Sequence, residues 1–239
     1  MRVGIFSAPK AGNHWIKCLL GQIYGLTWLG GEDKPDVTPE DFQAWVESGN
    51  FPDETIFHQH CRYTPAMADA VAAAPAHLVT IVRDPYDAFV SLYYWAQEKQ
   101  ERGLTHGRTR PRDAVVGKPL DHPDVLVYLQ KSFGVNLDKA LGWLQSGRAI
   151  PVRYEDLHRD AAAALTAVTE QIDPVAPERI HAAIDACKPD KMRLIDPKFE
   201  WHIRSAKTGD SRARLSEPHY AIFRERFGDQ IRALGYPVR

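Results

Sequence analysis

The sequence predicts an α/β protein with a central, mainly parallel sheet flanked by helices in a three-layer sandwich. Two observations favour this fold class: short apolar or β-branched segments alternate with helical patterns, and 44 % of the 239 residues are apolar. Alternation of this kind implies parallel strands joined by crossover helices. The length and apolar content suffice for one large core, so residues 1 to 239 are expected to form a single domain.

The expected elements follow this alternation in order. Strands are predicted at residues 2 to 7, 54 to 59, 77 to 82 and 149 to 153. Helices are predicted at residues 14 to 25, 64 to 73, 85 to 99, 136 to 146, 158 to 171, 177 to 187 and 216 to 233. Asp84 before Pro85 and Ser216 before Pro218 are helix start signals, and the last helix should end near Gly235.

Two stretches, residues 99 to 122 and 196 to 214, carry no clear pattern. The first has six basic side chains against three acidic ones, and the second is similarly basic and irregular. A loop of that length inside a compact domain is usually functional or disordered. Each stretch is therefore either a lid over a bound anion or a solvated surface loop.

The overall charge and the cysteines narrow the function classes. With 30 basic and 31 acidic residues, the chain gives no support for a general nucleic-acid or membrane-surface role, so any anion site must be local. Cys18, Cys61 and Cys187 are few, odd in number and widely spaced, which predicts neither a disulfide framework nor a zinc knuckle. No apolar leader or membrane span is visible, and a reducing cytoplasm fits best.

The segment from Ala8 to Trp15 joins the first expected strand to the first expected helix. Such a junction aims backbone N–H groups and the positive end of a helix dipole at one point, which favours a bound phosphate, and Lys10 adds a mobile positive charge. In the usual P-loop a lysine follows the last glycine and precedes a hydroxyl that holds magnesium. Here the lysine comes before Gly12, and Asn13 and His14 replace the hydroxyl, which predicts a phosphate site without magnesium.

A second anion site is expected at the end of the strand at 77 to 82. That strand delivers Arg83 to its carboxyl end, where open α/β sheets bind ligands, and Ser91 lies about two turns into the following helix. An arginine fork and a hydroxyl can clamp one phosphate.

Two histidines, His58 and His60, follow each other at period 2 near the end of the strand at 54 to 59. Both should therefore face the same cleft. A neutral imidazole within hydrogen-bond reach can take the proton of an acceptor hydroxyl, and we predict that His60 is this base, with His58 as the alternative. The pair is also half of a metal site, but no third ligand is apparent, so we expect no metal.

Together these motifs resemble those of sulfotransferases that use 3'-phosphoadenosine 5'-phosphosulfate (PAPS). Pro9-Lys10-x-Gly12-x-x-Trp15 resembles the family's 5'-phosphosulfate loop, and Arg83 to Ser91 resembles its 3'-phosphate motif at the same spacing of eight. His60 occupies the histidine position of the family's Lys-x-His segment. The resemblance implies a P-loop-like fold and transfer of a sulfuryl group from PAPS to a hydroxyl of a small-molecule or natural-product acceptor, with an amine as the second choice.

The resemblance also assigns residues. Tyr154, in Tyr154-Glu155-Asp156, takes the place of a tyrosine that contacts adenine, and residues 203 to 212 resemble the loop that closes over the 3'-phosphate. In that loop Arg204 fits the pattern, Lys207 or Arg212 would assist it, and Trp201 would replace a missing stacking tryptophan. The implied catalytic residues are His60, Lys10 and His58. The implied cofactor contacts are Lys10, Ala11, Gly12, Asn13, His14, Trp15, Arg83, Ser91, Tyr154, Arg204 and Lys207.

Two other function classes stay open at this point. A nucleotide-dependent kinase would share the anion loop, but it should carry a magnesium-binding hydroxyl after the lysine, which Lys10 lacks. A non-catalytic PAPS-binding protein would keep the phosphate clamps and need no base at His60. Aromatic side chains could line a pocket for an aromatic or lipid-like alcohol, and the oligomeric state is not readable. These side chains are Trp15, Trp28, Phe133, Tyr93, Tyr94 and Trp95.

Overall fold

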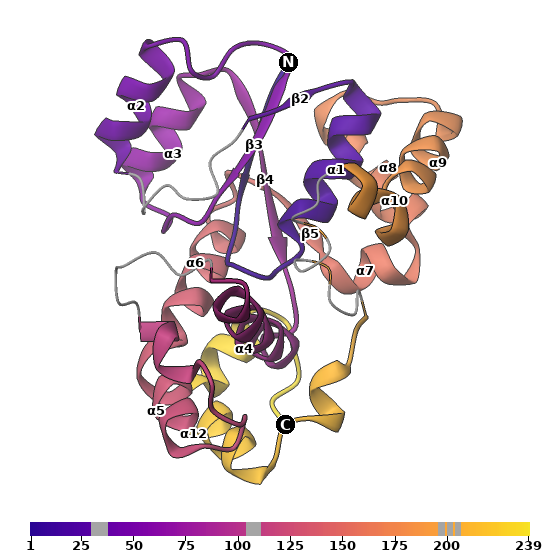
Figure 1. Ribbon diagram of the computed structural model, residues 1–239. Coiled ribbons are helices and arrows are strands. Elements are labelled where there is room, and N and C mark those ends of the chain that lie inside the picture. The colour runs from indigo at the N-terminus through magenta and orange to yellow at the C-terminus, as the bar shows by residue number, and fades with distance from the viewer. Residues whose placement is uncertain (30–37, 104–110, 196–198, 200–202, 204–206) are drawn as a thin grey trace.

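The computed structural model describes residues 1 to 239 except 30–37, 104–110, 196–198, 200–202 and 204–206 (Figure 1). Its centre is a five-stranded sheet in the order β2-β3-β1-β4-β5, and every pair of neighbours is parallel. The strands are β1 (Arg2–Phe6), β2 (Thr27–Trp28), β3 (Thr55–Gln59), β4 (Ala76–Val82) and β5 (Ile150–Arg153). The predicted α/β sandwich with a parallel sheet is therefore confirmed, with the two-residue β2 as an addition.

Side chains of the central strands alternate between two apolar layers. In β1, Val3 and Ile5 are fully buried in one layer, whereas Phe6 packs on the other side of the sheet. In β3 the partner residues Ile56 and Phe57 divide in the same way. This alternation follows from the period of two in a strand. Because apolar side chains point to both faces of the sheet, helices cover both faces.

The two faces carry different helices. Figure 1 shows α1 (Asn13–Tyr24), α8 (Ala161–Ile172), α9 (Pro177–Ala186) and α10 (Pro189–Ile195) on one side, together with α7 (Tyr154–Arg159). On the other side lie α2 (Pro39–Glu47) and α3 (Pro65–Ala72). Trp143 of α6 (Gly134–Gln145) stacks on Phe6 at 4.7 Å between ring centroids and completes this second layer.

A third apolar cluster joins the helices drawn below the sheet in Figure 1. It contains α4 (Pro85–Glu101), α5 (Pro123–Ser132) and α12 (Glu217–Ala233), with Phe89 and Phe223 at its centre. Two short 3₁₀ turns, η1 (Pro111–Val115) and η2 (Asp210–Ala213), flank these helices. Because Val82 at the end of β4 and Tyr86 in the first turn of α4 both belong to this cluster, it holds the junction between the two elements in place.

The predicted start signals are confirmed. Asp84 accepts hydrogen bonds from the backbone of Tyr86 and Asp87 at the start of α4, and Ser216 forms a capping box at the start of α12. Two helices were not predicted from the sequence: α2, which Thr38 caps and Pro39 opens, and α5, which His122 caps. Within residues 99 to 122, the structure describes the end of α4 and η1.

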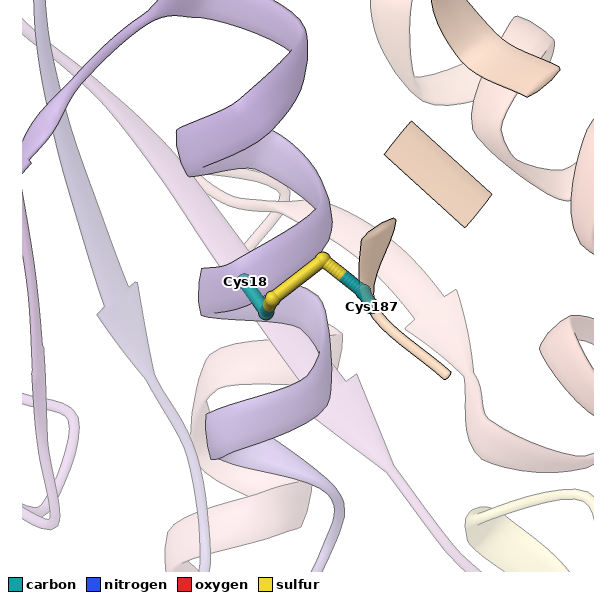
Figure 2. Close-up of a disulfide and its surroundings, with 2 residues drawn as sticks. All are labelled: Cys18 and Cys187. Carbon is teal, nitrogen blue, oxygen red and sulfur yellow. A yellow bond between two sulfur atoms is a disulfide. The ribbon is translucent and has the colours of Figure 1, made fainter. Parts of the chain in front are cut away.

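One prediction about the cysteines was wrong. Cys18 of α1 and Cys187, the residue after α9, form a disulfide with their Cα atoms 5.9 Å apart (Figure 2). They lie 169 residues apart in sequence, so spacing gives no signal. The two residues meet because α1 and α9 pack against each other in the same apolar layer. The number and spacing of the cysteines therefore no longer support a reducing compartment. Cytoplasmic localisation stays a prediction.

Along the described ranges, no helix combines the length and the apolar character needed to cross a membrane.

Candidate functional site

The loop between β1 and α1 has a backbone that only a few residue types adopt readily. Lys10 and Gly12 both have positive φ angles, 64° and 111°. A Cβ atom on Gly12 would lie 2.6 Å from Cδ2 of Tyr154 and 3.1 Å from Cδ1 of Ile81. Glycine is therefore required at position 12 both for its φ angle and because Tyr154 packs directly against the loop.

The side chain of Asn13 closes this loop. Its Nδ2 donates to the carbonyl oxygen of Ala8 at 3.0 Å, its Oδ1 accepts from the hydroxyl of Ser7, and the residue is only 4 % exposed. The side chain thus binds the loop itself, and what Asn13 offers a ligand is its backbone N–H. No side chain of the described residues caps α1 at Gly12, so N–H groups at the start of the helix can bind an anion.

Arg83 connects three of the predicted site segments. Its Nη1 donates to the carbonyl oxygen of Lys10 at 3.3 Å, and its Nη2 donates to that of Lys207 at 3.1 Å. Its guanidinium carbon lies 4.3 Å from the ring centroid of Tyr154. The Nε of Arg83 is buried and has no hydrogen-bond partner among the described residues, which leaves one donor for a ligand.

Asp87 holds the segment after Lys207 against the start of α4. Its two carboxylate oxygens accept from the backbone N–H groups of Gly209, at 2.6 Å, and Ser211, at 2.9 Å. Asp87 is 2 % exposed, and these bonds satisfy both of its oxygens. Sequence reasoning gave Asp87 no role, although it stands four residues after Arg83 in the motif that drew attention to Arg83 and Ser91.

Three rings gather beside the loop. Trp15 lies 5.8 Å from Tyr154 and 4.8 Å from His158, and Tyr154 lies 4.6 Å from His158. Burial raises the pKa of Tyr154, and burial and the charge of Arg83 both lower the pKa of His158, which favours neutral rings. His158 was not predicted, and its spacing of four from Tyr154 in α7 is the signal that places it on the same helix face.

The histidines form a row. The ring centroids of His14 and His58 are 4.8 Å apart, and those of His58 and His60 are 5.4 Å apart. The expectation that His58 and His60 share a face is confirmed. His58 lies between the other two and is 6 % exposed, whereas His60 is half-buried.

A backbone carbonyl orients the ring of His60. Its Nδ1 lies 2.9 Å from the carbonyl oxygen of Ser7. A carbonyl oxygen can only accept, so Nδ1 carries the proton and Nε2 holds the basic lone pair. This is the tautomer that a general base at Nε2 requires.

The remaining predicted site residues lie in α4, near the start of α1, near Arg83 or outside the described residues. Ser91 lies in α4 and is half-buried, and Ala11 and His14 lie in the loop and the first turn of α1. Arg204 and Trp201 lie outside the described residues. Of the two suggested helpers of Arg204, Lys207 is the one whose backbone reaches Arg83.

Among the described residues, no three His, Cys, Asp or Glu side chains come together in a group that could hold a metal ion.

Comparisons with known proteins agree with this architecture. No protein-family model matches the chain. The Arabidopsis thaliana protein named cytosolic sulfotransferase 17 is 26 % identical over 177 residues, which cover 65 % of this chain and 47 % of that protein. The match therefore spans about half the length of that relative.

Two solved structures have a similar fold. Mouse sulfotransferase SULT7A1, complexed with 3'-phosphoadenosine 5'-phosphate (PAP), superposes with a TM-score of 0.72 at 17 % identity over 97 % of this chain and 84 % of that chain. Retinol dehydratase in complex with retinol and PAP gives a TM-score of 0.65 at 13 % identity over 100 % and 82 %. The chain is thus similar in sequence to part of a plant protein named a cytosolic sulfotransferase, and its fold is similar to those of two proteins solved with PAP.

Proposed function

We propose that this protein is a PAPS-dependent sulfotransferase that moves a sulfuryl group from PAPS to a hydroxyl of a small-molecule acceptor and releases PAP. The observation that carries this proposal is the position of Arg83, which contacts the Lys10 loop, Tyr154 and the segment at Lys207. The site has two candidate anion-binding parts, the Lys10 loop and the segment at Lys207, and Arg83 contacts both. A nucleotide with phosphates on both its 3' and 5' sides matches this arrangement.

Each part of the nucleotide has a candidate partner. The 5' side would lie on the uncapped start of α1, where the backbone N–H groups of residues 11 to 15 and the ammonium of Lys10 offer positive charge. The 3'-phosphate would accept from Nε of Arg83 and from Ser91, and Lys207 would lie beside it. The adenine would lie near Trp15 and Tyr154.

The proposed reaction needs one base and one electrophilic group. PAPS supplies the sulfuryl group and leaves as PAP. Nε2 of His60 takes the proton of the acceptor hydroxyl while its oxygen bonds to sulfur and the bond from sulfur to the 5'-phosphate oxygen breaks. Lys10 stabilises the charge that develops on that leaving oxygen. We propose that alignment and these charges suffice without a metal, because a sulfuryl group bears less charge than a phosphoryl group.

The geometry supports His60 over His58 as the base. The ring of His60 is half-buried with a fixed tautomer, whereas His58 lies enclosed between His14 and His60. In this proposal His58 is a positioning residue that packs against the base.

The kinase alternative has less support. Where a P-loop kinase has a magnesium-binding hydroxyl, this chain has Asn13, whose side chain bonds to Ser7 and Ala8 within the loop. A non-catalytic PAPS-binding protein would not need a base, so it does not explain why the Ser7 carbonyl orients the ring of His60.

Two measurements test the proposal in sequence. In a thermal-shift titration, PAP should raise the melting temperature, and ATP with magnesium should raise it far less, because a ligand stabilises the state that it binds. Labelled PAPS with a panel of hydroxyl compounds should then give a sulfated product. Stabilisation by ATP with magnesium but not by PAP would overturn the nucleotide assignment, and PAP binding without any sulfated product would favour the binding protein.

A further inference from the structure

The 207–211 segment, residues Lys207 to Ser211, bonds through three backbone groups to two side chains at the junction of β4 and α4. The carbonyl oxygen of Lys207 accepts from Nη2 of Arg83 at 3.1 Å. The N–H groups of Gly209 and Ser211 donate to the two carboxylate oxygens of Asp87 at 2.6 Å and 2.9 Å. These bonds span 122 to 124 residues of sequence, so they fix where a distant part of the chain crosses the candidate 3'-phosphate site.

Two carbonyl oxygens set the orientation of the Arg83 guanidinium. Nη1 donates to the carbonyl oxygen of Lys10 and Nη2 donates to that of Lys207, while the guanidinium carbon lies 4.3 Å from the ring centroid of Tyr154. Nε, which is buried and has no hydrogen-bond partner in the described part of the chain, remains for a ligand. If the Lys207 carbonyl moved away, Nη2 would lose its partner and the planar group could turn. The position of the 207–211 segment therefore bears directly on Nε of Arg83.

The carboxylate of Asp87 is unsuited to direct contact with the nucleotide. A negative charge beside a phosphate would repel it. The side chain is 2 % exposed, and both of its oxygens already accept from the 207–211 segment. Burying a carboxylate is costly unless it is hydrogen-bonded, so these two bonds stabilise Asp87 as well as the segment. Any effect of Asp87 on a bound phosphate must therefore pass through that segment.

The backbone at Gly209 lets two N–H groups converge on one carboxylate. Its φ angle is 78°, and the residue directly precedes η2. A Cβ atom at this position would have no atom of the described residues within 4 Å. Space therefore permits a side chain at position 209, and the φ angle alone disfavours one, most strongly a β-branched one.

We propose, on the basis of the proposed sulfotransferase function, that Asp87 and Gly209 are positioning residues for the 3'-phosphate. They fix the 207–211 segment on the start of α4, and the Lys207 carbonyl then holds the guanidinium of Arg83 with Nε towards the 3'-phosphate. Neither residue touches the nucleotide. Replacing either one should remove only the part of the binding energy that the 3'-phosphate supplies and leave binding at the start of α1 intact.

Two nucleotides that differ by one group measure this part of the binding energy. PAP carries the 3'-phosphate, and adenosine 5'-phosphate (AMP) lacks it. Isothermal titration gives a Kd for each, with AMP measured by displacement of PAP. The wild-type protein should bind PAP about a hundredfold or more tightly than AMP, the effect expected of two charge-assisted hydrogen bonds.

Asp87→Asn and Gly209→Val test the two positioning residues separately. The amide of asparagine keeps one acceptor and turns an NH₂ group towards the other backbone N–H. Valine at position 209 strains the backbone without touching Asp87. Each variant should weaken PAP binding by about tenfold or more, the effect of one lost charge-assisted hydrogen bond, while AMP affinity stays unchanged.

Gly49→Val is the matched control for Gly209→Val. Gly49 lies just after α2, has the same φ angle of 78°, and also has no described atom within 4 Å of a built Cβ. The melting temperatures of the two valine variants should therefore fall by similar amounts. Gly49→Val should keep the wild-type ratio of the two Kd values.

The outcomes separate the two proposals. If the wild-type protein binds PAP no more tightly than AMP, the nucleotide assignment of the sulfotransferase proposal fails, and the positioning proposal fails with it. If the wild type prefers PAP and both variants keep that preference, the positioning proposal alone is overturned. Equal losses of PAP and AMP affinity, or a lost preference in Gly49→Val, would show a general structural effect and overturn it as well. If Asp87→Asn does not fold, Gly209→Val decides.

Discussion

Nδ1 of His60 donates a 2.9 Å hydrogen bond to the carbonyl oxygen of Ser7, which lies 53 residues earlier in the chain. This bond joins the end of β3 to the loop that carries Lys10. Because β1 and β3 pair in parallel, with Phe6 opposite Gln59, the residues after both strands emerge at the same edge of the sheet. One contact therefore sets both the position and the tautomer of the proposed base.

The first prediction concerns this base. His60→Gln should lower kcat by about 10²-fold to 10⁴-fold, the usual contribution of a general base, while PAP affinity changes little. Steady-state turnover with PAPS and a thermal shift with PAP measure the two effects. His58→Gln is the matched comparison, because it alters the neighbouring ring and leaves the Ser7 bond in place. Near-normal turnover by His60→Gln would remove the assignment.

The second prediction concerns Arg83. Arg83→Lys keeps the charge but removes the planar fork that reaches the carbonyl oxygens of Lys10 and Lys207. Charge-assisted hydrogen bonds contribute roughly 1.5–3 kcal/mol each, so PAP affinity should fall by about 10-fold to 100-fold. Isothermal titration with PAP measures the loss.

Arg102→Lys serves as the control for Arg83→Lys. Arg102 forms an exposed pair with Glu98 one turn away in α4, and its replacement should leave PAP affinity unchanged. Equal affinities for wild type and Arg83→Lys would contradict a central role for the guanidinium.

The features that sequence predicted are local ones. The loop from Ala8 to Trp15 and the junction from Val82 to Arg83 each lie between a strand and a helix, so short-range patterns suffice to place them. The Asp87 bonds to Gly209 and Ser211 span more than a hundred residues, and the Cys18 partner spans still more. No local pattern encodes such contacts, because they depend on how helices pack after the sheet has formed.

The third prediction concerns the disulfide. Reduction should lower the free energy of unfolding by about 2–4 kcal/mol, because the bridge between Cys18 and Cys187 restricts the unfolded chain over 169 residues. Urea unfolding with and without dithiothreitol measures the change. Cys18→Ser should match the reduced wild type and show no response to the reductant. If the reductant affects both proteins equally, the bridge is not the cause.

The fourth prediction concerns Asp84 and Arg239. Nη2 of Arg239 lies 2.6 Å from Oδ2 of Asp84, and Nη1 of the same arginine donates to the hydroxyl of Ser211 at 3.3 Å. Burial raises the pKa of Asp84, and the charge of Arg239 opposes this effect. Because the pKa in the folded state lies above the ordinary value of 3.8, ionisation of Asp84 costs stability as pH rises through that range.

Arg239→Gln should raise the pKa of Asp84 further and so increase this cost. Well below pH 3.8 Asp84 is protonated in the folded and unfolded states of both proteins, so its ionisation contributes no difference between them there. The deficit of the variant should grow as pH rises through the two folded-state pKa values and then stay constant towards neutral pH. Urea unfolding across that range measures the deficit, and Asp84→Asn in the Arg239→Gln background should abolish its growth with pH. A deficit that is independent of pH in both backgrounds would show that Arg239 acts by packing on Tyr86, at 4.7 Å from its ring, rather than through the charge of Asp84.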